Sequence, residues 1–118
     1  MVSEEIKEKA LILAGAIVES EEYQNFLEKE SELKQDEEAQ RLLSIFQEKQ
    51  REFMAMQLSG EMNEELVNEL SEIQQKLNSM ESVISFVESY QKFINMLGEI
   101  GEIISQEIKF DFGEVYRG

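Results

Sequence analysis

The sequence predicts an all-α protein, because three of its features favour helix almost from end to end. None of the 118 residues is proline, which loops and helix starts normally use. Hydrophobic residues make up 42% and charged residues 31%, a composition typical of a folded chain. Apolar residues recur at intervals of three and four along most of the sequence. We therefore expect a single domain, a helical bundle of about five helices with a long C-terminal helical hairpin.

The first two helices are expected at residues 3–19 and 21–34. Ser3 can cap free amides, and two glutamates follow it in the first turn, where negative charge is favourable. The apolar face of the first helix would consist of Ile6, Ala10, Leu13, Ala14 and Ile17. A break at Ser20 separates it from the second helix, whose face would contain Tyr23, Phe26, Leu27 and Leu33.

The third and fourth helices are expected at residues 36–59 and 63–78. Asp36 and Asn63 are suitable N-caps, and Gly60 can adopt the left-handed conformation that ends a helix. Met62 and Val67 have the spacing of a hydrophobic staple. The third helix has an apolar stripe made of Ala39, Leu42, Leu43, Phe46 and Phe53. The short turn between these two helices predicts an antiparallel hairpin.

A fifth helix is expected at residues 79–109, followed by a non-helical tail at 110–118. The apolar stripe changes phase at Asn78-Ser79, which indicates a kink or a short break, and we favour the break. Beyond it, apolar residues alternate by four and three, the spacing of a coiled-coil seam: Val83, Val87, Tyr90, Ile94, Leu97, Gly101 and Ile104. Further apolar residues flank this seam, so a hairpin alone cannot cover it. It must lie inside a bundle or against a second copy of the chain, and we expect a homodimer.

Enzymatic chemistry is not expected, and we assign no catalytic, cofactor-binding or metal-binding residue. The chain has no histidine and no cysteine, which removes the commonest general base, the best thiol nucleophile and the best transition-metal ligands. The Glu-x-x-His pairs of di-metal helical proteins are therefore absent, and so is the spacing of a calcium-binding loop. Gly98 and Gly101 fall within a helix, where they favour close helix–helix approach rather than phosphate binding.

The charge of the chain also restricts its partners. A net charge of -15 disfavours direct contact with nucleic acid or with an anionic membrane surface. No apolar run approaches the roughly 20 residues that a membrane span needs, and the charged start does not resemble a signal peptide. We therefore expect a cytoplasmic protein.

Two groups of residues are candidates for contact with another protein. Met54, Met56 and Leu58 cluster near the predicted hairpin turn, and flexible methionines suit adaptable binding surfaces. Filling the end of a bundle would explain them equally well. Phe112 and Tyr116 could dock on a partner, or they could fold back over their own bundle.

Several segments occur in an order and spacing that resemble one family: Ser20-Glu-Glu-Tyr23 with Phe26-Leu27 and Glu30, Asp36-Glu-Glu-Ala39 with Leu43 and Phe46, Leu58-Ser-Gly60-Glu61, the apolar stretch 86–104, and the ending 112–118. They look like the YlbF/YmcA/YheA family of small bacterial helical proteins, and the ending resembles the YheA branch.

This resemblance implies an all-helical, usually dimeric protein with no known enzymatic activity. Relatives in the regulatory branch act in competence, sporulation and biofilm control, through a complex that binds an iron–sulfur cluster and assists an RNA-processing endoribonuclease. This chain cannot ligate a cluster through thiolates, because it has no cysteine. The leading hypothesis is therefore a non-catalytic cytoplasmic adaptor that acts through protein–protein contacts. The alternative is a chaperone-like or structural helical protein that holds apolar client segments.

Overall fold

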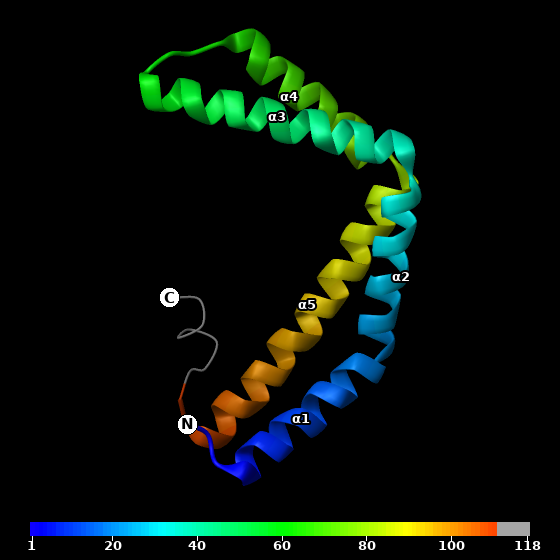
Figure 1. Cartoon of the computed structure of the whole chain (residues 1–118), viewed down its shortest axis with the longest axis vertical. Helices are drawn as coiled ribbons and strands as arrows, with labels where there is room; N and C mark the ends of the chain where they lie inside the picture. The colour runs from blue at the N-terminus through cyan, green and yellow to red at the C-terminus, as the bar shows by residue number, and fades with distance from the viewer. Residues whose placement is uncertain (111–118) are drawn as a thin grey trace. The chain divides into compact units, whose positions relative to one another are not determined.

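The computed structural model describes residues 1–110, and all of its regular structure is helical. The helices are α1 (Glu4–Glu19), α2 (Glu21–Gln35), α3 (Glu37–Ser59), α4 (Glu64–Asn78) and α5 (Glu81–Ile108) (Figure 1). The expected all-α class with five helices is confirmed. The expected tail, with Phe112 and Tyr116, lies outside the described residues apart from its first position.

The helix ends follow from local capping. The side chains of Ser3, Asp36 and Asn63 each accept a hydrogen bond from the backbone amide three residues on, at 3.3, 3.1 and 3.2 Å. These bonds satisfy amides that have no partner within the first helical turn. Gly60 ends α3 with φ at 79°, a conformation that side chains with a Cβ rarely adopt. The capping side chains and the left-handed glycine thus explain why the helices begin and end at these positions.

The apolar phase change after α4 is a break between two helices. α4 ends at Asn78, and α5 begins at Glu81. The carbonyl of Met80 accepts the backbone amides of Val83 and Ile84, at 3.1 and 2.9 Å, which is the hydrogen bonding of a new helix start. Because helix hydrogen bonding restarts here, the stripes of α4 and α5 need not keep one register.

The described chain divides into two compact units. The central unit is Lys29–Val87, and the terminal unit consists of Met1–Glu28 with the described residues from Glu88 on. α2 and α5 each contribute residues to both units. The single domain expected over the whole chain stays a prediction.

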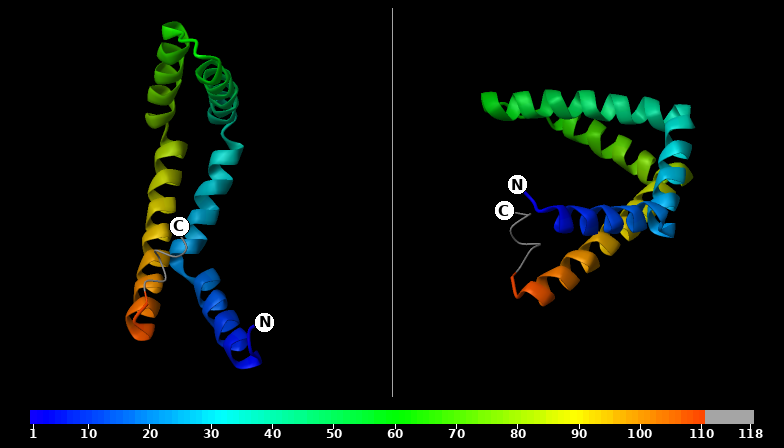
Figure 2. Two further views of the ribbon diagram at one scale, coloured as in Figure 1. Left: turned by 90° about the vertical axis from the view of Figure 1, so that its left-hand side faces the viewer. Right: turned by 60° about the horizontal axis from the view of Figure 1, so that its bottom comes forward.

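The central unit is built around the hairpin of α3 and α4, which lie side by side in Figures 1 and 2. Its buried core consists of Ala39, Leu42, Leu77 and Val83. Partly buried side chains pack against this core: Leu33, Leu43, Phe46, Ile73 and Met80. An ion pair joins the two helices nearer the turn, where Lys49 Nζ donates to Glu69 Oε2 at 2.5 Å. This hydrogen bond raises the pKa of Lys49 above its ordinary value.

Asp36 connects the start of α3 with the start of α5. Its Oδ1 atom caps α3, while its Oδ2 atom accepts a hydrogen bond from Ser82 Oγ at 2.6 Å. The Ser82 hydroxyl, and after it the Ala39 amide, hold the pKa of Asp36 below its ordinary value. The ionised carboxylate therefore joins two segments that are 46 residues apart in sequence.

A matched pair of leucines on α3 tests where the core lies. Leu42 is 5% exposed and Leu58 is 90% exposed. Leu42→Ala should lower the free energy of unfolding by about 2–4 kcal/mol through lost burial and a new cavity, whereas Leu58→Ala should change it by less than about 0.5 kcal/mol. Urea denaturation of both variants measures the difference, and equal losses would contradict this assignment of the core.

A second prediction concerns Asp36 and pH. Asn is as good an N-cap as Asp, so Asp36→Asn keeps the helix cap but removes the charge that accepts from Ser82. Because the folded-state pKa of Asp36 lies below its ordinary value of 3.8, its stabilising contribution is present above that value and is lost as pH falls through the folded pKa. The variant should therefore be less stable than the parent at pH 7, and the gap should narrow as pH falls below 3.8.

Thermal unfolding of both proteins across this pH range measures the gap. Ser82→Ala is the control, since combining it with Asp36→Asn should cost little beyond either single change. A gap that stays constant with pH would show that the ionised carboxylate is not its cause.

Candidate interaction surfaces

An aromatic cluster holds the start of α2 against the middle of α5 in the terminal unit. The ring centroids of Phe26 and Phe93 are 5.4 Å apart, with the rings stacked. Tyr23 also lies 5.4 Å from Phe93, and Tyr90 lies 5.9 Å from Phe26. These distances are in the favourable range for aromatic pairs. One side of the broad apolar face of α5 is therefore covered by its own chain.

The other side of that face is open. Val87, Ile94 and Leu97 are between 36% and 55% exposed, and they follow the three-and-four spacing that predicted a seam. Tyr90 belongs to the same row, with its ring partly engaged by Phe26. We call the row of Val87, Tyr90, Ile94 and Leu97 the α5 stripe. Partial burial of large apolar side chains along one continuous line is the geometry of an unfilled helix–helix contact.

The remaining predicted seam residues have different surroundings. Val83 is buried in the core of the central unit. Gly101 and Ile104 are partly buried. The predicted seam thus comprises one residue in the chain's own core, two partly buried residues and the more exposed α5 stripe.

α1 has more apolar surface than its own chain covers. None of its residues is buried. The predicted face is only partly supported, since Ile17 is partly buried whereas Ile6 stays exposed. A second group, consisting of Leu11, Ile12 and Val18, is also exposed. The predicted face did not include this second group. The signal for it in the sequence was the run from Ala10 to Val18, which contains no polar side chain.

α1 gains little stabilising burial from the described chain. Figure 2 shows α1 diverging from the end of α5. A helix of 16 residues is marginally stable by itself in water and gains most of its stability from packing.

Two glycines lie in the middle of helices with open space around them. A Cβ atom added at Gly15 or at Gly98 would meet no atom within 4 Å. Glycine inside a helix costs about 1 kcal/mol relative to alanine. The close helix approach predicted at Gly98 is therefore not made by the described chain.

The predicted contact residues near the hairpin turn divide by exposure. Met54 and Leu58 are 62% and 90% exposed, whereas Met56 is partly buried. Met62, just past Gly60, is 86% exposed, whereas Val67, its predicted staple partner, is 42% exposed. We call Met54, Leu58 and Met62 the hairpin end.

The charge around the hairpin end is mainly negative, and Arg51, three residues before Met54, is the nearest basic residue along α3. Between Arg51 and Lys76 the sequence has six glutamates and no basic residue. They are Glu52, Glu61, Glu64, Glu65, Glu69 and Glu72. Glu69 is paired with Lys49 on α3. The hairpin end is thus an apolar patch beside acidic side chains.

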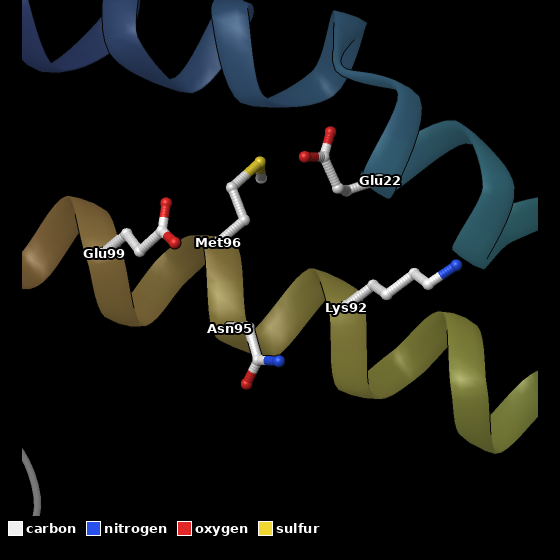
Figure 3. A pocket seen from close by; sticks show the side chains of 5 residues that line it. All are labelled: Glu22, Lys92, Asn95, Met96 and Glu99. Carbon is white, nitrogen blue, oxygen red and sulfur yellow. The ribbon is translucent and has the colours of Figure 1, made fainter.

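A small open pocket in the terminal unit does not resemble a reaction centre. It has a volume of about 200 Å³ and lies between the start of α2 and the middle of α5 (Figure 3). Its lining consists of Glu22, Lys92, Asn95, Met96 and Glu99. Two carboxylates, an ammonium, an amide and a thioether offer no activated nucleophile. Nowhere in residues 1–110 do three side chains gather that could hold a metal ion.

Within the part of the chain that the structure describes, no helix is both long enough and apolar enough to cross a membrane. The fold and its surfaces define a small all-α protein distinguished by uncovered apolar side chains.

Residues 6–109 match the family model described as "Control of competence regulator ComK, YlbF/YmcA", and the chain belongs to this family. This confirms the resemblance found in the sequence.

Curated relatives agree with this assignment. The chain is 31% identical over 108 residues to a UPF0342 protein of Desulfitobacterium hafniense (strain Y51), covering 91% of this chain and 82% of the relative. It is 32% identical over 93 residues to a UPF0342 protein of Staphylococcus aureus (strain JH9), covering 78% and 82% of the two chains.

A solved structure shows the same fold. A chain in the crystal structure of Bacillus subtilis RicA in complex with RicF superposes with a TM-score of 0.84, covering 92% of this chain and 96% of that one. The two sequences are 23% identical, so the likeness concerns the fold.

Proposed function

We propose that this chain is a non-catalytic regulatory adaptor that acts in the cytoplasm as a homodimer and binds another protein. The observation that supports this most directly is the α5 stripe, whose large apolar side chains the described chain covers only in part. The family description concerns control of a competence regulator, and the similar solved structure is a complex of two proteins. Both are consistent with a function exerted through protein contacts.

The α5 stripe has the properties of a dimer contact. Its spacing is that of a helix–helix seam, and a two-fold axis would place the same row from each copy face to face. Burying apolar surface is favourable by roughly 25 cal/mol per Å², so several exposed side chains on each copy supply a substantial driving force. α1, in the same unit as Tyr90, Ile94 and Leu97, has further exposed apolar residues.

The charges on α5 do not oppose such a contact. Glu88, Lys92 and Glu99 lie on the face of the helix away from the stripe, given a helical period of about 3.6 residues. A net charge of -15 repels a second copy at long range, and salt screens that repulsion. Apolar contact along the stripe can therefore dominate at physiological ionic strength.

Two other occupants of the stripe lead to different observations. A related but different chain would leave the purified protein monomeric until that chain is added. A client-holding protein would bind many unfolded chains weakly, whereas an adaptor would keep one or two partners.

Ile94→Asp tests the homodimer. The substitution places an unpaired charge in the centre of the stripe, where burial would require removing its water. We expect the protein to have the mass of two chains by light scattering after size exclusion at micromolar concentration, and the variant to have the mass of one chain or to unfold.

Asn95→Asp is the matched control, because it adds the same charge about 100° further around the helix. It should remain dimeric. A parent protein with the mass of one chain at all micromolar concentrations would refute the homodimer.

Gly98→Ala tests whether a second copy approaches α5 closely. Alanine normally stabilises a helix by about 1 kcal/mol relative to glycine, and no atom of the described chain would obstruct it. If the second copy packs beside Ile94, the added methyl group should weaken the dimer while increasing helicity. Asn95→Ala, on the polar face, is the control and should leave the dimer unchanged in dilution experiments. A tighter dimer with Gly98→Ala would argue against close approach here.

A further inference from the structure

We propose that the hairpin end binds a basic amphipathic helix of a partner protein. This inference rests on the proposed adaptor function and specifies the chemistry of its partner. Leu58 and Met62 are 90% and 86% exposed, nearly as accessible as in an unfolded chain, and Met54 is 62% exposed. Three large apolar side chains are thus presented to solvent close to one turn.

The fold of the hairpin does not require these side chains to be apolar. The turn is formed by Gly60 in the left-handed conformation and by the Asn63 cap on Leu66. The buried core of the central unit contains none of the three. Met56 and Leu66 lie nearby in the sequence, and both are more buried. The exposed residues therefore contribute little to folding, while they cost solubility.

Charge identifies the occupant. All the charged residues between Arg51 and Lys76 are acidic, so a positively charged segment would be attracted to this end of the hairpin. The hairpin end of a second copy would present the same acidic residues and be repelled. The same reasoning disfavours nucleic acid and anionic lipid. A basic segment of another protein is the occupant that both the apolar and the acidic residues favour.

The apolar residues indicate the shape of that segment. Methionine is flexible and polarisable, and surfaces rich in it adapt to the apolar face of an amphipathic helix. Leu58 would fill the centre of such a contact, with Met54 and Met62 on either side of it in sequence. The lysines or arginines of the bound helix would face the glutamates at the start of α4.

A synthetic peptide tests the proposal directly. The probe is a fluorescent helix of about 18 residues with a leucine stripe and lysine elsewhere, and its counterpart replaces each lysine by glutamate. We expect the full chain to bind the lysine peptide in fluorescence anisotropy, with affinity that falls as salt increases. The glutamate peptide should not bind. Equal binding of the two peptides would overturn the charge argument.

Variants locate the contact. Replacing Met54, Leu58 and Met62 by serine should weaken binding about tenfold or more, whereas Ile103→Ser, an exposed apolar change on α5, should not. If the triple variant loses helicity, Leu58→Ser alone is used and should still weaken binding several-fold. Unchanged affinity in the folded serine variants would refute the proposed site.

Charge variants separate local from general attraction. Changing Glu61, Glu64 and Glu65 to glutamine should weaken binding and flatten its salt dependence. Changing Glu4, Glu5 and Glu8 on α1 alters the net charge equally and should have a much smaller effect. Equal effects of the two sets would mean that the peptide responds only to net charge, which would refute the site.

Light scattering on the same samples separates this inference from the proposed homodimer. If the protein is a dimer and its serine variants still bind the peptide, the docking site is refuted and the homodimer is not. If the protein is a monomer and the serine variants lose peptide binding, the homodimer is refuted and the docking site is not.

Discussion

The width of the apolar face on α5 is the constraint on which the rest of the structure depends. A surface helix usually has one apolar stripe facing the core and polar residues on its opposite face. The apolar residues of α5 cover more of its circumference than one such stripe. Near its start, Val83 is buried in the core with α3 and α4. Further along, Phe93 is covered by the aromatic residues of α2. What remains only partly covered after both contacts is the α5 stripe, whose side chains are between 36% and 55% exposed.

Local signals in the sequence were sufficient for the helix ends. An N-cap is a short-range interaction, so Asp36 and Asn63 could be recognised without knowledge of the fold. The same is true of Gly60, whose positive φ depends only on the turn that it occupies. The additional bond from Ser82 to Asp36 could not be predicted, because it joins residues that only the folded chain brings together.

Burial was harder to predict than helicity. Val83 and Val87 are consecutive positions of the same predicted seam, yet one is in the core and the other is more than half exposed. The spacing of apolar residues identifies a face but does not say which neighbour covers it. Met56 and Leu58 differ in the same way, since two residues along a helix corresponds to about 200° around it. The exposed residues of α1 were missed because an apolar run without periodicity does not indicate any particular face.

The two uncovered surfaces differ in the charges beside them, and this difference separates their expected partners. The α5 stripe has few charged neighbours on its own face, which suits contact with an identical surface. The hairpin end is accompanied mainly by acidic residues, which opposes contact with an identical surface and favours a basic one. A single chain can therefore use apolar burial for both contacts without confusing the two partners, because charge excludes the wrong pairing at the hairpin end. An adaptor needs this separation, since self-association that occupied the docking surface would compete with partner binding.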